Sequence, residues 1–271
     1  MNKQRSPDDR THDASQTSRA FLQDTTARPI GAPTINLGWR LRLGVIQASV
    51  NTVAEPQMQA MVPPGVYLHT TRLKLVGSDD DEVLAMADKV EEAASLLADA
   101  DPQRILFHCT ATSTFNLDIS DSVAERITRA TGIPAHATSA CIVAALRTLG
   151  ARKIVMATPY IRSINEREVR FFAAHGIEVV DEFGLDLPGG RAFRQVEPAE
   201  WYRLVLAHRH SDADAYFISC ANVRAAEVIE TLEQDLKRPV VTSNTAAVWR
   251  LLRESGIRDS IANFGILLRD F

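Results

Sequence analysis

Residues 105–113 read ILFHCTATS, an apolar run that ends at the thiol of Cys109 and continues in small polar residues. Residues 216–224 read YFISCANVR and repeat this order around Cys220. Such a short apolar run is typical of a buried strand in a parallel sheet, and a helical pattern follows each one. Both thiols are therefore predicted at the carboxyl end of a strand, facing a helix N-terminus whose partial positive charge favours the thiolate.

A single cysteine after a strand is more often a small core residue than a reactive group. Two cysteines in matching surroundings favour a shared chemical task, because two thiols that face each other across a cleft can act on both faces of one small substrate. The third cysteine, Cys141, lies in the helical run SACIVAAL at residues 139–146, among apolar neighbours. We expect it to be a core residue.

Apolar runs alternate with helical patterns from residue 39 onward. Strands are expected at residues 42–47, 66–71, 104–109, 153–158, 178–183 and 215–220, with shorter ones at 134–137 and 239–242. Helices are expected at residues 80–98, 121–131, 139–149, 164–175, 198–208, 223–236 and 246–254. This alternation implies an α/β fold with parallel sheets and right-handed crossovers, in which ligands bind beyond the carboxyl ends of the strands.

The chain also repeats itself in order. Residues 43–51 (LGVIQASVN) pair with residues 153–160 (KIVMATPY), and a cysteine strand follows each. A Pro-led short strand comes next in both halves and runs into a Thr-Ser pair, at residues 138–139 and 242–243. We therefore predict two pseudo-symmetric, flavodoxin-like parallel-sheet subdomains with the active site in the cleft between them. The first comprises residues 39–137 and 250–271, and the second comprises residues 138–249.

The first 38 residues differ from the rest. They are rich in Ser, Thr, Asp, Gln and Arg, show no helical or strand periodicity and contain one aromatic residue, Phe21. Such a segment buries too little apolar surface to offset the cost of ordering. We expect residues 1–38 to form a disordered arm without a chemical role.

The composition is that of an ordinary globular protein, with 271 residues of which 45% are hydrophobic and 24% charged. The net charge of −4 gives no reason to expect nucleic acid or an anionic membrane as partner. Three cysteines are too few, and odd in number, for a secreted disulfide framework, so a cytoplasmic location is expected. No zinc-type ligand spacing or glycine-rich nucleotide motif is present, and neither a metal nor a cofactor is predicted.

Several of these motifs together resemble a known family. They are SVNT at residues 49–52 with the following Glu55-Pro56, the two cysteine segments, TPY at 158–160 followed by NERE at 165–168, and VVTSN at 240–244. In this order they resemble the aspartate/glutamate racemase superfamily, specifically its branch of maleate cis-trans isomerases and arylmalonate decarboxylases. The resemblance covers residues 41–256. The decarboxylases of this branch keep only the second cysteine, so Cys109 and Cys220 together favour the isomerases and racemases. Val50 departs from the pattern, which implies a small polar residue there.

The resemblance implies a mechanism. Cys109 would attack the double bond of a maleate-like dicarboxylate, the bond would rotate as a single bond, and the thiolate would leave to give the trans acid. Cys220 would donate and accept a proton on the other face. The enediolate that develops needs hydrogen-bond donors. The candidates for binding the substrate are Asn51, Thr110, Ser113, Tyr160, Asn222 and Thr245. The resemblance also implies a small carboxylic acid as partner and a possible homo-oligomer.

The residues leave alternatives open. Asn51 and Asn222 are equally suited to capping helices, and the Tyr160 ring could be a packed aromatic. Glu166 and Glu168 are expected on a solvated helix face. A two-base racemase or epimerase of an amino-acid or hydantoin-like substrate, a malonate-type decarboxylase and a non-catalytic acid-binding protein are the competing functions.

Overall fold

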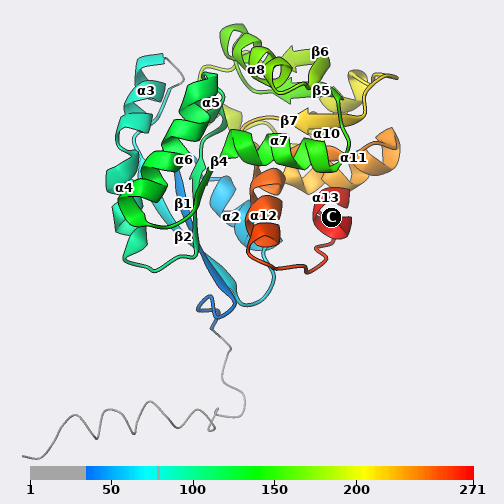
Figure 1. Cartoon of the computed structure of the whole chain (residues 1–271). Coiled ribbons are helices and arrows are strands. Elements are labelled where there is room, and N and C mark those ends of the chain that lie inside the picture. Colours follow the sequence, from blue (N-terminus) through cyan, green and yellow to red (C-terminus); the bar gives the residue numbers. More distant parts are fainter. Residues whose placement is uncertain (1–34, 78–79) are drawn as a thin grey trace, which may run out of the picture. The chain divides into compact units, whose positions relative to one another are not determined.

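The computed structural model describes residues 35–77 and 80–271 (Figure 1). Of the predicted arm, residues 1–34 lie outside the described residues. Its expected disorder and its lack of a chemical role stay predictions.

Eight parallel strands form two four-stranded sheets (Figure 1). The first sheet has the order β2-β1-β3-β4 and comprises β1 (Leu41–Ala48), β2 (Val66–Leu73), β3 (Arg104–His108) and β4 (Ala135–Ala137). The second has the order β6-β5-β7-β8 and comprises β5 (Lys153–Thr158), β6 (Glu178–Gly184), β7 (Ala215–Ile218) and β8 (Val240–Thr242). The strand orders correspond one to one, which confirms the predicted α/β fold of two similar parallel-sheet halves.

Helices connect and cover the sheets. In the first half they are α2 (Ala54–Met61), α3 (Asp80–Asp88), α4 (Val90–Ala98), α5 (Thr110–Ser113), α6 (Leu117–Thr131) and α7 (Thr138–Thr148). After β5 follow α8 (Arg162–Ala174), α9 (Gly190–Phe193), α10 (Pro198–Ala207), the 3₁₀ turn η1 (Ala226–Val228), α11 (Ile229–Leu236), α12 (Ser243–Glu254) and α13 (Ile266–Asp270). The helix expected at residues 80–98 is two helices that meet at Lys89, whose backbone is not helical.

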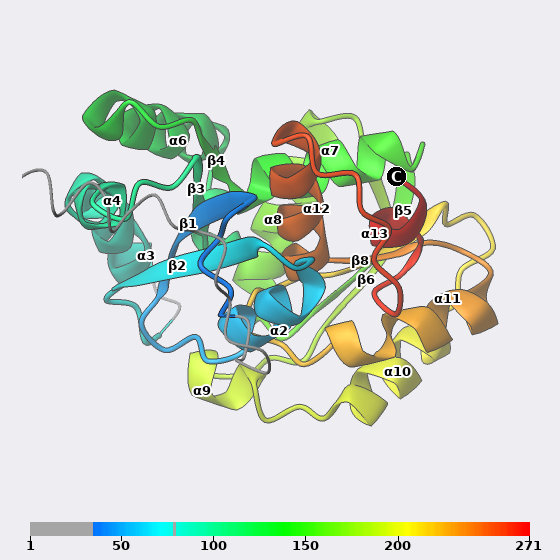
Figure 2. The same cartoon turned by 90° about the horizontal axis from the view of Figure 1, so that it is seen from below.

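Helices α7 and α12 lie side by side where the two sheets meet (Figures 1 and 2). Helix α7 follows β4 of the first sheet, yet its apolar face packs in one core cluster with residues of β5 and β7. Helix α12 follows β8 of the second sheet, yet its first turn hydrogen-bonds to residues at the end of β3. This exchange locks the two halves together. The exact boundaries predicted for two subdomains, at residues 137/138 and 249/250, stay predictions.

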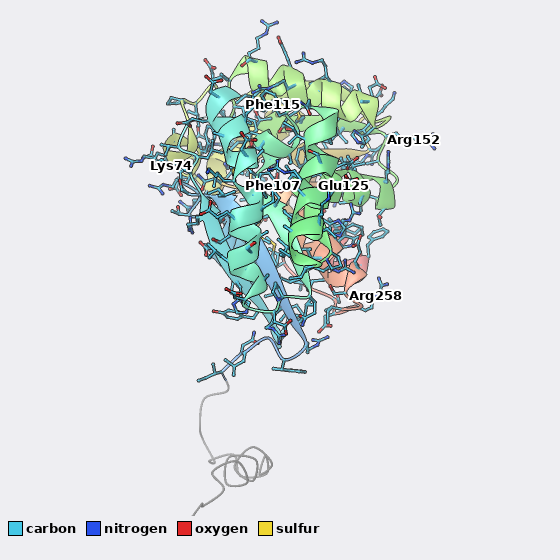
Figure 3. All side chains as sticks on the ribbon, turned by 60° about the vertical axis from the view of Figure 1, so that its left-hand side comes forward. Lys74, Phe107, Phe115, Glu125, Arg152 and Arg258 are labelled. Carbon is cyan, nitrogen blue, oxygen red and sulfur yellow. The ribbon has the colours of Figure 1, made fainter. Side chains whose placement is uncertain are left out.

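A second apolar cluster belongs to the first half alone. It joins β1, β2 and β3 to helices α3, α4 and α6, and Cys109 is one of its members. Figure 3 looks at this sheet through α4 and α6: Phe107 on β3 lies behind the helices and is fully buried, whereas Glu125 on α6 is exposed. The cluster holds the end of β3 rigidly and so fixes the position of Cys109.

Candidate active site

One small cavity lies beyond the carboxyl ends of the central strands β1, β3, β5 and β7. Its volume is about 50 Å³. Both cysteines of the matching segments line it. The full lining is Ala48, Val50, Asn51, Leu75, Gly77, Val83, His108, Cys109, Thr110, Ala111, Tyr160, Gly190, Phe193, Cys220, Ala221 and Asn222. Of the eight predicted site residues, Ser113 and Thr245 are the two that do not line it.

Cys109 follows β3 directly and is the N-cap residue of the short helix α5. The hydroxyl of Thr112 donates to its sulfur at 3.2 Å, and the backbone amide of Thr112 also donates to it. The side chain is 8% exposed. The predicted position, a thiol at a strand end opposite a helix start, is therefore what the structure has.

The thiolate of Cys109 is nevertheless disfavoured in the ligand-free protein. Burial raises the pKa of Cys109, and the two Thr112 donors lower it by less. The negative charge of Glu168 adds to the rise. The expectation that the helix N-terminus sets a low pKa was wrong, because a helix of four residues offers few amide donors while desolvation acts on the whole thiolate.

The Thr112 hydroxyl is expected to control how fast Cys109 reacts with iodoacetamide. Thr112→Val should slow alkylation of Cys109 about tenfold at a given pH, because a hydrogen bond to a charged group contributes roughly 1.5 kcal/mol or more. The rate is measured by mass spectrometry of tryptic peptides. Thr128→Val, which alters a hydroxyl on the outer helix α6 that donates only to the Ala124 carbonyl, is the matched control.

Cys141 provides the internal standard for that measurement. It is fully buried in α7, and burial raises its pKa to about 12. Labelling of Cys141 as fast as Cys109 would contradict the assignment of Cys109 as the reactive thiol.

Cys220 lies two residues beyond the end of β7. Its backbone φ is 90°, a value that residues other than glycine rarely adopt. The backbone amide of Asn222 donates to its sulfur at 3.3 Å, and the hydroxyl of Tyr160 is a second donor. Burial nevertheless raises the pKa of Cys220 to about 12, and a charge on Cys109 raises it further. The two thiols are thus close enough to influence each other's protonation, and both are protonated at neutral pH.

Tyr160 lies in the cavity, although its ring is also packed. The ring meets Phe193 edge to face, with 5.4 Å between the centroids. Burial raises the pKa of Tyr160, as does its hydrogen bond to Cys220, so the hydroxyl is a neutral donor. Tyr160 is therefore both a packed aromatic residue and a hydrogen-bond donor in the cavity.

The two asparagines link the site to the backbone. Asn51 caps the start of α2, since its Oδ1 accepts from the amides of Val53 and Ala54 at 3.0 Å. Its Nδ2 makes no hydrogen bond to any residue that the structure describes, which leaves two donors for a ligand. Asn222 accepts from the Thr52 amide and donates to the Gly190 carbonyl at 2.7 Å, so it holds three loops around the cavity together.

The remaining three predicted residues differ in their positions. Thr110 lines the cavity, and its hydroxyl donates to Ser243 at 2.9 Å. Ser113 donates to the Thr110 carbonyl and accepts from the Ser139 amide, so it joins α5 to α7. Thr245 forms a capping box with Thr242 at the start of α12. The geometry gives Ser113 and Thr245 structural tasks in place of substrate contact.

Glu168 is a buried carboxylate that the sequence interpretation placed on a solvated helix face. Its neighbour Glu166 is exposed and pairs with Arg162, as expected. Glu168 is fully buried, and its Oε1 accepts from Thr114 at 3.3 Å and from Ser219 at 3.0 Å. These two hydroxyls flank the two cysteine segments. The signal that could have revealed it is the period of α8, which places Glu168 on the same face as Ile164 and Phe171.

Glu168 is expected to make stability depend on pH. Burial raises its pKa from 4.5 to about 7, so the folded protein keeps a proton that the unfolded chain releases between these values. The free energy of unfolding should therefore fall by about 3 kcal/mol as pH rises through this window, since one pKa unit corresponds to about 1.4 kcal/mol. Urea unfolding at about pH 5 and about pH 8 measures it.

Glu168→Gln should remove this dependence. The free energy of unfolding of the variant, relative to that of the wild type, should therefore increase as pH rises. Glu166→Gln, on the exposed face of the same helix, is the control and should leave the dependence in place. A Glu168→Gln variant whose stability falls with pH as much as that of the wild type would contradict a neutral buried acid.

Among the residues that the structure describes, no cationic side chain lines this cavity. His108 is fully buried between Thr138 and Asn244, and burial lowers its pKa to about 4, so it is neutral at pH 7. Arg72 binds the Asn51 carbonyl and Glu55 from outside, a structural role. Within residues 35–77 and 80–271, no group of three His, Cys, Asp or Glu side chains is placed to hold a metal ion. In the same ranges, no helix has the length and apolar character that crossing a membrane requires.

Comparison with known proteins agrees with this geometry. The sequence matches a family profile described as arylmalonate decarboxylase over residues 43–268. A maleate isomerase of Geobacillus stearothermophilus is 24% identical over 242 residues, which is 84% of this chain and 96% of that protein. The crystal structure of the maleate isomerase Iso from Pseudomonas putida S16 has a TM-score of 0.82 at 22% identity, over 85% of this chain and 98% of that one.

A third relative is the maleate cis-trans isomerase of Nocardia farcinica. A cysteine-to-serine mutant of it, solved with a covalently bound succinylcysteine intermediate, has a TM-score of 0.80 at 21% identity, over 85% of this chain and 99% of that one. The predicted relationship is thereby confirmed. Since the profile covers residues 43–268, this chain belongs to the arylmalonate decarboxylase family, in the branch that includes the maleate isomerases.

Proposed function

We propose that this chain is a cysteine-dependent cis-trans isomerase of a maleate-like dicarboxylate that works without a cofactor. The observation that carries the proposal is that Cys109 and Cys220 line one small cavity together with the neutral polar residues Asn51, Thr110, Tyr160 and Asn222. The chain's relatives include maleate isomerases, which supports the same reaction.

The reaction begins at Cys109, which first releases its proton to solvent and regains it when turnover is complete. Its thiolate forms a bond to one alkene carbon of the cis acid, and the π electrons move to the other carbon and its carboxylate as an enediolate. Preorganised neutral donors stabilise this charge. The Asn51 Nδ2 group, which makes no hydrogen bond to a described residue, supplies them.

Cys220 then acts on the second alkene carbon, which carries the electron pair. Its thiol donates a proton and gives a saturated adduct on Cys109, in which the former double bond rotates freely. The Cys220 thiolate takes the proton back, the double bond re-forms in the trans geometry, and the bond to Cys109 breaks. Atoms and charge balance, since both thiols return to their starting states. The Tyr160 hydroxyl and the Asn222 amide stabilise the Cys220 thiolate in between.

A two-base racemase is the second candidate. The observation that favours it is that both thiols line one cavity, so that one could remove a proton from a substrate while the other donates one. A panel of acids in deuterated water, followed by proton NMR, separates the candidates. Conversion of maleate to fumarate supports the isomerase, deuterium exchange at a stereocentre supports the racemase, and loss of carbon dioxide supports a decarboxylase.

We also propose that the protein acts in the cytoplasm, because all three cysteines are free and free thiols persist in reducing compartments. A homo-oligomer is proposed from the family resemblance, and light scattering after size-exclusion chromatography tests it.

A further inference from the structure

One side of the cavity is apolar. Val50, Leu75 and Val83 line it next to Cys109, and they belong with Cys109 to the apolar cluster of the first half. Leu75 and Val83 are buried, and Val50 is half-buried. The side chains of these three residues offer no hydrogen bond to a ligand. We call Val50, Leu75 and Val83 the apolar wall.

The cavity lining also includes polar groups, among them the donors to Cys220. Tyr160 and Asn222 surround Cys220, and Asn51 supplies the amide donors that no described residue uses. A ligand that contacts both sides needs carboxylates toward these donors and an apolar group toward the wall. Unsubstituted maleate carries only a C–H on each alkene carbon, so it would leave the wall without a partner.

The size of the cavity limits that apolar group. The cavity is small, at about 50 Å³, so the apolar group has to be small as well. Val50 also closes the space toward α9. A Cβ atom added to Gly190 would lie 2.4 Å from the Cγ1 atom of Val50, so the Val50 side chain already contacts the backbone of this helix. The hydroxyl of Thr52 binds Arg194 at the end of α9, and Figure 2 shows α9 beside the start of α2. These contacts hold α9 close to Val50, so we expect only a small substituent to fit against this side of the cavity.

We propose that the preferred substrate is a maleate with one methyl-sized apolar substituent on an alkene carbon, and that Val50 determines this preference. The inference rests on the proposed isomerase function. Cys109 adds to the unsubstituted alkene carbon, and the electron pair moves to the substituted carbon and its carboxylate. The substituent lies one bond from the attacked carbon and stays against the apolar wall during rotation. Reversal of the addition releases the trans acid and restores the thiolate.

The test compares maleate with 2-methylmaleate, using kcat/KM from proton NMR with the wild type, Val50→Ser and Val76→Ser. A methyl group in an apolar pocket changes kcat/KM by roughly tenfold or more. The wild type should therefore prefer 2-methylmaleate by about tenfold, and Val50→Ser should lose that preference. Val76→Ser is the matched control, because Val76 is exposed and does not line the cavity.

Each outcome decides a different point. Equal turnover of both acids by the wild type, or faster turnover of maleate, would overturn the inference and leave the isomerase function standing. A tenfold preference that Val50→Ser keeps would overturn the role of Val50. Turnover of neither acid, with no adduct on Cys109, would overturn the proposed function itself. The wild-type ratio decides the substrate class even if a variant fails to fold.

Discussion

Cys109→Ala is expected to abolish isomerisation, with a loss of at least roughly 10⁴-fold in kcat, since removal of an enzyme nucleophile leaves only binding and electrostatic contributions. The methyl side chain cannot add to the double bond, so no adduct should form either. Proton NMR of maleate conversion measures turnover, and intact-protein mass spectrometry measures the adduct.

The matched control is Cys141→Ala, which removes a thiol from the core without touching the cavity. It is expected to lower the free energy of unfolding while leaving kcat unchanged. Loss of activity in Cys141→Ala, or full activity in Cys109→Ala, would show that the nucleophile has been assigned to the wrong thiol.

Cys220→Ala is expected to stop turnover by a different route. Loss of a general acid and base costs about 10²- to 10⁴-fold in rate. Addition at Cys109 is still possible, and solvent can protonate the enediolate. Expulsion of the thiolate then lacks its proton acceptor, so a saturated adduct should accumulate on Cys109. Mass spectrometry should find a mass increase equal to one maleic acid, located on the Cys109 peptide.

The double variant, Cys109→Ala with Cys220→Ala, should form no adduct and so identifies the attached residue. An adduct on neither thiol, combined with solvent exchange into an amino acid by the wild type, would instead favour the two-base racemase. The two single variants therefore separate addition from proton transfer, which pKa values alone do not.

The strands were the most predictable part of the fold. β5 has the bounds that its apolar run predicted, and the other runs differ by one or two residues at an end. The short helices α2, α5, α9 and α13 were missed, because four to eight residues give too few turns to show a helical period. Helix α9 matters most, since it brings Gly190 and Phe193 to the cavity.

In the site, strand-end positions were predictable and hydrogen-bond partners were not. Cys109, Tyr160 and Cys220 follow strands directly or closely, so topology brings them together. Ser113 and Thr245 are also polar residues that come soon after a strand. They lie one turn further into their helices, where they hydrogen-bond to backbone groups. The raised pKa of both thiols depends on packing across the two halves, which no local pattern records, whereas the period of α8 does indicate the burial of Glu168.

The backbone at Cys220 has a consequence for evolution. A side chain at a φ of 90° costs roughly 1–3 kcal/mol, a cost that glycine avoids. A related protein that is not selected for this thiol would be more stable with glycine at position 220. Directed evolution for thermal tolerance alone is therefore expected to select Cys220→Gly early and to lose the enzyme in doing so. At this position, catalysis requires cysteine, whereas the stability of the fold favours glycine.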